Sequence, residues 1–131
     1  MNQFILFIII IILYIICDAP YLLYNIKHYN YIVSKIQGND RGFTKRYYSA
    51  LMVYITFAIG MITLVLSRAE TSHDALYYGA LMGFVSYGVF DFTIHFMLEG
   101  YDIKTVVMDV IWGTILSASV AWIAFYISKK W

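Results

Sequence analysis

Four long apolar runs constrain the fold of this chain more than any other feature. They cover residues 4–24, 48–67, 77–98 and 105–126, each close to the roughly 20 residues that cross a bilayer as an α-helix. Apolar residues make up 62% of the chain and charged residues only 13%, far from the balance of soluble domains. The runs lack the alternating polarity of β-barrel strands. The sequence therefore predicts an all-α integral membrane protein, an up-down four-helix bundle forming one domain over residues 1–131.

Charged residues in the connections predict how the chain is oriented in the membrane. Short cytoplasmic connections carry the larger number of Lys and Arg residues. The side that holds residues 25–47 has six of them and the opposite side has three, so we expect both termini outside the cytoplasm. The six are Lys27, Lys35, Arg41, Lys45, Arg46 and Lys104, and the three are Arg68, Lys129 and Lys130. Tyrosines near the ends of the runs, among them Tyr29 and Tyr101, are typical of interfacial belts.

The N-terminal part of the chain raises three local expectations. No Lys or Arg precedes the first run and no small-residue cleavage pattern follows it, which favours a retained helix over a secretory signal. Pro20 removes a backbone donor within that run, so we expect it to bend the helix or end its regular part. Residues 29–38, YNYIVSKIQG, predict a short interfacial helix ended by Gly38.

Three aspartates interrupt the apolar runs. Asp18 and Asp91 each lie fourteen residues into their runs, or about 21 Å at a rise of 1.5 Å per residue. Asp109 lies four residues into a helix that runs the opposite way, or about 6 Å in. In a hydrocarbon core about 30 Å thick, the three fall at a similar depth. Because ionisable groups are costly against lipid, we expect them to face the bundle interior or a water-filled cavity, within hydrogen-bonding or one-water reach of each other.

The helical repeat places aromatic or hydrogen-bonding side chains on the face of each aspartate. The candidate intramembrane cluster is Asp18, Tyr21, Tyr87, Asp91, Thr93, Asp109 and Trp112. Two weaker candidates, His95 and Glu99, follow Asp91 at intervals of four residues. Small residues spaced by four predict close contacts between helices. These packing candidates are Gly79, Gly83, Gly113 and Ser117.

Residues 90–116 resemble a family of small predicted membrane proteins of unknown function, DUF2177. The family pattern resembles Tyr-Asp-Leu-Thr-Asn, then Gly-Trp, then Asp-x-x-Trp-Gly-Thr, with an Asp-x-x-Trp in its first helix that is similar to residues 18–21. The matching positions are Asp91, Thr93, Gly100, Asp109, Trp112, Gly113 and Thr114. Phe90, Ile94 and Tyr101 depart from the pattern, and His95 and Glu99 lie outside it. The resemblance implies a four-helix membrane protein and no particular reaction.

The candidate polar residues also have purely structural explanations. The aspartates could simply hydrogen-bond across helices and fix the bundle's register. Asp109 could be an acidic residue near a helix N-terminus, stabilised by the helix dipole. His95 is better explained as a satisfied or interfacial residue than as a metal ligand, and we expect Glu99 to reach water. No metal or cofactor site is predicted.

The sequence leaves three classes of function open. The first is a structural or assembly component of a membrane complex. The second is a proton, cation or small-solute pathway formed by an oligomer. The third is a membrane enzyme that acts on a lipid-soluble substrate with carboxylates as acid and base, although specific enzyme motifs are absent. The expected partners are the lipid bilayer and a homo-oligomer or larger membrane assembly. The net charge of +1 gives no sign of a nucleic-acid partner.

Overall fold

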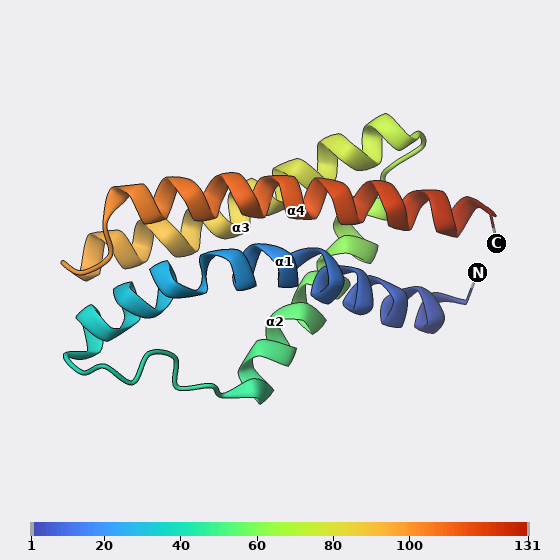
Figure 1. Cartoon of the computed structure of the whole chain (residues 1–131). Helices are drawn as coiled ribbons and strands as arrows, with labels where there is room; N and C mark the ends of the chain where they lie inside the picture. The colour runs from blue at the N-terminus through green and yellow to red at the C-terminus, as the bar shows by residue number, and fades with distance from the viewer. Residues whose placement is uncertain (1, 131) are drawn as a thin grey trace.

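The computed structural model describes residues 2–130, which form an all-helical bundle without strands. Four of its segments are long and apolar enough to cross a membrane: residues 3–37, 47–66, 72–97 and 103–129. Successive spans run in opposite directions, and the N-terminal end of the first lies near the C-terminal end of the last (Figure 1). The predicted all-α bundle of four membrane-spanning helices is confirmed.

The first helix is longer than the sequence suggested. α1 covers Gln3–Gln37 without interruption, in place of a span over residues 4–24 and a separate short helix over residues 29–38. Its 35 residues extend about 52 Å, well beyond a hydrocarbon core of about 30 Å. The C-terminal part of α1 therefore extends beyond the membrane core on the side of the basic connection.

Packing explains why α1 continues past the membrane core. Ile32 is buried in an apolar cluster that includes Val106 of the last helix, and Ile36 one turn later packs against this cluster. Gly38 then ends α1 in the left-handed conformation, with φ of 76°, and its backbone N–H donates to the Ser34 carbonyl oxygen. The helix end expected at Gly38 is thus present, because glycine adopts this conformation without steric cost.

Pro20 lies inside α1 and does not end it. Because proline has no N–H group, the helix lacks one backbone hydrogen bond at this point. Figure 1 shows that α1 changes direction along its length. A bend therefore describes this helix better than a termination.

The second span combines two kinds of helix. α2 covers Tyr47–Gly60, and the π-helix η1 continues it over Met61–Leu66. In η1 the chain is wound more widely, and the Ser67 N–H donates to the Ile62 carbonyl five residues back. Turns of this kind occur often at functional sites. No feature of the sequence predicted this one.

The third helix begins earlier than expected because its N-terminus is capped. α3 covers Ser72–Met97, whereas the apolar run suggested a start at residue 77. The Thr71 hydroxyl accepts from the Asp74 backbone N–H, and the Asp74 carboxylate accepts from the Thr71 N–H. This reciprocal capping box satisfies two N–H groups that otherwise have no partner in the helix.

Asp102, rather than Asp109, is the acidic residue at the start of the last helix. α4 covers Ile103–Lys130, with no acidic residue in its first turn. The Asp102 carboxylate accepts from both the hydroxyl and the backbone N–H of Thr105, and these bonds lower the pKa of Asp102. The cap is therefore fully formed at neutral pH and weakens as the pH falls towards that lowered pKa. Asp109 lies six residues into α4, about 9 Å along it, so the helix-dipole explanation of Asp109 is excluded.

α3 and α4 form the closest pair of helices, and glycines allow their approach. A Cβ at Gly83 would overlap the backbone carbonyl of Gly113, and one at Gly79 would collide with Ala121. Ser117 also lies against this contact. Small residues let two helix backbones approach closely in a membrane. This contact brings Asp91 of α3 and Asp109 of α4 into the same seam.

A pair of glycine substitutions tests the seam. Gly83→Ala should destabilise the protein by about 1 to 3 kcal/mol, because the added methyl group overpacks the contact. Gly88→Ala is the matched control, since a Cβ at Gly88 meets nothing within 4 Å. It should be neutral or slightly stabilising, because alanine favours the helix over glycine. Reversible unfolding of both variants in detergent micelles measures the difference, and equal stabilities would refute the glycine contact.

Candidate functional site

Asp18 joins three helices. It lies on α1 with 7% of its surface exposed. Its Oδ2 accepts a hydrogen bond from the Tyr54 hydroxyl of α2 at 2.7 Å, and its Oδ1 accepts from the Trp112 indole N–H of α4 at 2.8 Å. Both carboxylate oxygens thus have a donor, and both donors are neutral. Asp18 is suited to holding α1, α2 and α4 together.

Asp91 is the most deeply buried carboxyl group and is only half satisfied. It is 0% exposed on α3, and its Oδ1 accepts a hydrogen bond from the Tyr101 hydroxyl. Burial, followed by this hydrogen bond, raises the pKa of Tyr101 above its usual value, so the hydroxyl stays a donor at neutral pH. No N–H or O–H group of residues 2–130 reaches the Asp91 Oδ2. A buried oxygen without a donor is costly and needs an explanation.

The neighbour of Asp91 across the seam is a second carboxyl group. The Asp109 side chain lies close enough to that of Asp91 for the two carboxyl groups to interact, and its Oδ1 accepts from the Tyr29 hydroxyl at 3.1 Å. Two ionised carboxylates have no proton to place between them, so the contact is a hydrogen bond only when one carboxyl is protonated. We call Asp91 and Asp109 the carboxyl pair.

Aromatic side chains connect Asp18 to the carboxyl pair. Trp112, which donates to Asp18, stacks on Tyr21 with ring centroids 4.6 Å apart and an angle of 7° between the planes. The Tyr21 and Tyr29 hydroxyl oxygens lie 2.6 Å apart, and Tyr29 donates to Asp109. The three aspartates therefore belong to one network, although only two of them meet directly. Asp18 reaches the pair through this chain of rings and hydroxyls.

Besides Tyr87, which is described below, three of the predicted candidates lie outside the network. Thr93 and Glu99 are exposed. His95 bonds through Nδ1 to the backbone carbonyl oxygen of Tyr101 at 2.7 Å, which requires the ring proton on that nitrogen. In this role His95 holds the connection between α3 and α4 in place. No group of three or more metal-ligating side chains occurs among the described residues.

The tyrosines that donate to the carboxyl groups were not predicted from the sequence as their partners. Tyr29 and Tyr101 were assigned to interfacial belts, and Tyr54 was not singled out. Tyr29 could have been found, because it lies eleven residues after Asp18 and therefore on the same face of α1. Tyr54 and Tyr101 carry no such signal, because neither lies on the helix of its partner. Tyr54 of α2 donates to Asp18 of α1, and Tyr101 donates to Asp91 from the connection that follows α3.

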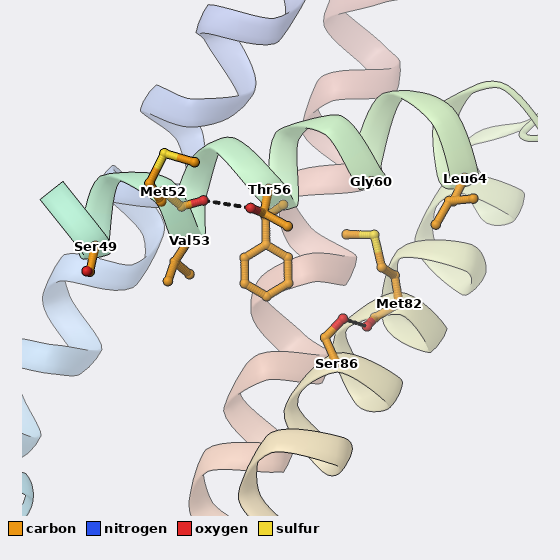
Figure 2. A pocket seen from close by; sticks show the side chains of 9 residues that line it. Ser49, Met52, Val53, Thr56, Gly60, Leu64, Met82 and Ser86 are labelled. Atoms are coloured by element: carbon orange, nitrogen blue, oxygen red, sulfur yellow. Dashed lines mark hydrogen bonds between the residues drawn. The ribbon is translucent and has the colours of Figure 1, made fainter.

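A groove on the outside of the bundle leads to Asp109. It consists of two adjoining hollows of about 550 Å³ and about 270 Å³, and Val53, Phe57 and Ser86 line both. Figure 2 shows the larger hollow, with side chains of α2 on one side and Met82 and Ser86 of α3 on the other. Asp109 lines the smaller hollow. The groove is thus a route from the lipid-facing surface to the carboxyl pair.

Tyr87 and Phe90 of α3 also line the smaller hollow. The Tyr87 ring stacks against Phe57 of α2 with centroids 5.8 Å apart, and it occupies the space that a side chain at position 113 would need. Tyr87 therefore forms a wall of the groove beside Asp109 and makes no hydrogen bond to a carboxyl group of the network.

Comparison with known protein families identifies the family of this chain. The family model of the predicted membrane proteins DUF2177 matches residues 3–126, nearly the whole sequence. The chain belongs to the DUF2177 family. Comparisons with curated proteins and with solved structures gave no match. The resemblance inferred from residues 90–116 is thereby confirmed at the level of the family.

The family assignment gives this DUF2177 member a class and no activity. Its description states only that the proteins are predicted to lie in membranes. Several positions of the matched pattern nevertheless come together in the structure: Asp18 accepts from Trp112, and Asp91 lies near Asp109. Thr93, which belongs to the same pattern, is exposed.

The bond between Asp18 and Trp112 can be tested in this DUF2177 member by a double-mutant cycle. Trp112→Phe should cost about 1 to 3 kcal/mol, because it leaves a buried carboxylate oxygen without its donor. In an Asp18→Ala background, which has no acceptor for the indole N–H, the same change should cost less, with a coupling energy of about 0.5 kcal/mol or more. Trp122→Phe, at a 47% exposed position of α4, is the control. Additive effects of the two changes on unfolding would show that the bond is not made.

Proposed function

We propose that this protein is a proton-exchanging membrane protein in which the carboxyl pair, Asp91 and Asp109, holds one proton between its two members. The observation that carries the proposal is the buried Asp91 Oδ2, which has no donor, on a side chain that lies near a second carboxyl group. Among the three classes left open by the sequence, this corresponds to the proton or cation pathway.

The energetics of burial support a shared proton. Two neighbouring carboxylates in a medium of low dielectric constant repel each other and have lost their hydration, so one of them binds a proton. The donors that reach the pair, the Tyr29 and Tyr101 hydroxyls, are neutral and leave its charge uncompensated. With one proton present, the pair carries a single negative charge and the Asp91 Oδ2 gains a partner.

A purely structural role accounts for Asp18 better than for the pair. Asp18 has one neutral donor on each oxygen, which is what a tie between helices requires. A tie between α3 and α4 could be made by one carboxylate and one neutral donor, without the repulsion of a second carboxyl group. The second carboxyl group therefore favours a site whose protonation changes.

Tyr101 supports a route by which the proton reaches water. It lies in the connection between α3 and α4, outside the spanning helices, and its hydroxyl donates to the buried Asp91. The adjacent Asp102 and Thr105 belong to the same end of the bundle. By the distribution of Lys and Arg, we assign this end to the cytoplasm and both termini to the opposite side.

Transport across the whole membrane would require more than one chain in this proposal. The groove leads from the side of the bundle to Asp109, and the remaining distance to the far aqueous side contains the packed contacts of α3 with α4. A homo-oligomer or a larger membrane assembly would supply that passage.

Infrared spectroscopy of the reconstituted protein tests the shared proton. The wild-type protein should show the C=O stretch of a protonated carboxyl group at neutral pH. Asp91→Asn and Asp109→Asn should each remove this band, because an amide N–H then replaces the shared proton and the remaining carboxylate ionises. Asp18→Asn is the control and should keep the band. A wild-type spectrum without the band, or its loss in Asp18→Asn, would contradict the proposal.

A further inference from the structure

The groove between α2 and α3 combines apolar walls with one acidic end. Val53, Phe57, Leu64, Met82 and Phe90 contribute apolar side chains to its two hollows. None of the residues that line the hollows is Lys, Arg or His, and the single ionisable carboxyl group among them is that of Asp109. This distribution fits a molecule with an apolar tail and a cationic head.

Two of the hydroxyl groups in the groove are already occupied. The Thr56 hydroxyl donates to the Met52 carbonyl, and the Ser86 hydroxyl donates to the Met82 carbonyl (Figure 2). Both bonds lie within single helices and consume the hydroxyl protons. A ligand head group therefore finds its strongest partner at Asp109, whose neighbour Asp91 has a buried oxygen without a donor.

The groove opens where lipid would cover the protein. Val53, Leu64 and Phe90 are 49%, 55% and 58% exposed, as expected of residues that face acyl chains. The volumes of the hollows, about 550 Å³ and about 270 Å³, are comparable to those of small-molecule sites, about 300 to 1,000 Å³. A molecule dissolved in the bilayer can thus enter between α2 and α3.

We propose that this groove binds a long-chain primary amine from the bilayer, with its nitrogen at Asp109 and its alkyl chain between α2 and α3. The inference rests on the proposed function, because the neutral amine would take up the proton that the carboxyl pair shares. The N–H bond forms as the carboxyl O–H bond breaks, which leaves an ammonium group between two carboxylates. An acyl chain alone would fill the groove without a partner for Asp109.

Other ionisable groups surround the head-group position. Asp91 and Tyr87 face it from α3, and Tyr29 and Asp18 act on Asp109 from α1. These groups carry negative charge or none, so each favours an ammonium group over an anion or a neutral head. Primary amines fit better than quaternary ammonium groups, because only the former donate N–H bonds to both carboxyl groups.

Binding of dodecylamine to the full chain in lipid nanodiscs tests the inference, with dodecanol as the uncharged probe of equal length. Dodecylamine should bind at least about tenfold more tightly than dodecanol, a difference of ~1.4 kcal/mol. Asp109→Asn should reduce the affinity for dodecylamine to that for dodecanol. Equal affinities of the wild-type protein for the two probes would mean that the groove holds acyl chains without regard to charge, and would overturn the inference.

Two matched substitutions test the location. Val53→Trp fills both hollows and should weaken dodecylamine binding about tenfold. Leu51→Trp adds the same ring to α2 at a position that is also 49% exposed and lines neither hollow, so it should leave the affinity unchanged. Ser86→Leu, with Val89→Leu as a folding control, fills the groove from α3 should Val53→Trp fail to fold. Equal affinities of a filling variant and its control would overturn the inference.

The infrared band of the protonated carboxyl separates this inference from the proposed function. A wild-type protein that shows the band and does not discriminate between the probes would refute the amine site and leave the proton site standing. Loss of the band on saturation with dodecylamine is the result expected when both hold. A wild-type protein without the band would refute the proton site itself.

Discussion

The cost of placing a carboxyl group in a membrane governs this structure. A polar atom in the hydrocarbon core must find its partners within the protein, because no water is there to supply them. Asp18 meets this requirement with the Tyr54 hydroxyl and the Trp112 indole N–H. Asp91 meets it on one oxygen, through Tyr101. The second oxygen of Asp91 has no donor among residues 2–130, and the groups around it decide how this charge is accommodated.

Close approach of two helices brings the Asp91 side chain near that of Asp109. Gly83 lets α3 lie directly on the backbone of Gly113 in α4, and the two carboxyl groups then meet in the seam. The helix contact is thus the physical cause of the carboxyl pair, and the proposed proton binding would follow from that pair. The groove between α2 and α3 gives molecules in the bilayer access to the carboxyl pair. It forms because α2 diverges from α3, and Asp109 lines its smaller hollow.

Much of this architecture could be predicted from the sequence, because hydropathy and helical phase are local properties. Span lengths identified the four helices, and the depth of the aspartates indicated a common level. The ends of the helices were less predictable: α1 continues to Gln37 because Ile32 packs against a distant helix. The donors were least predictable, since Tyr54 reaches Asp18 only after α2 has packed across α1. The groove depends on the divergence of two helices, which no single-sequence pattern encodes.

Comparison of Asp91→Asn with Asp91→Ala tests the carboxyl pair most directly. An asparagine can accept the Tyr101 hydrogen bond and donate an N–H to Asp109, so this variant should unfold at a free energy close to that of the wild type. An alanine removes both interactions and should cost about 1 to 2 kcal/mol, the range of interhelical hydrogen bonds in membranes. Unfolding in detergent micelles measures both variants. Full stability of Asp91→Ala, or equal damage from the two substitutions, would contradict the account.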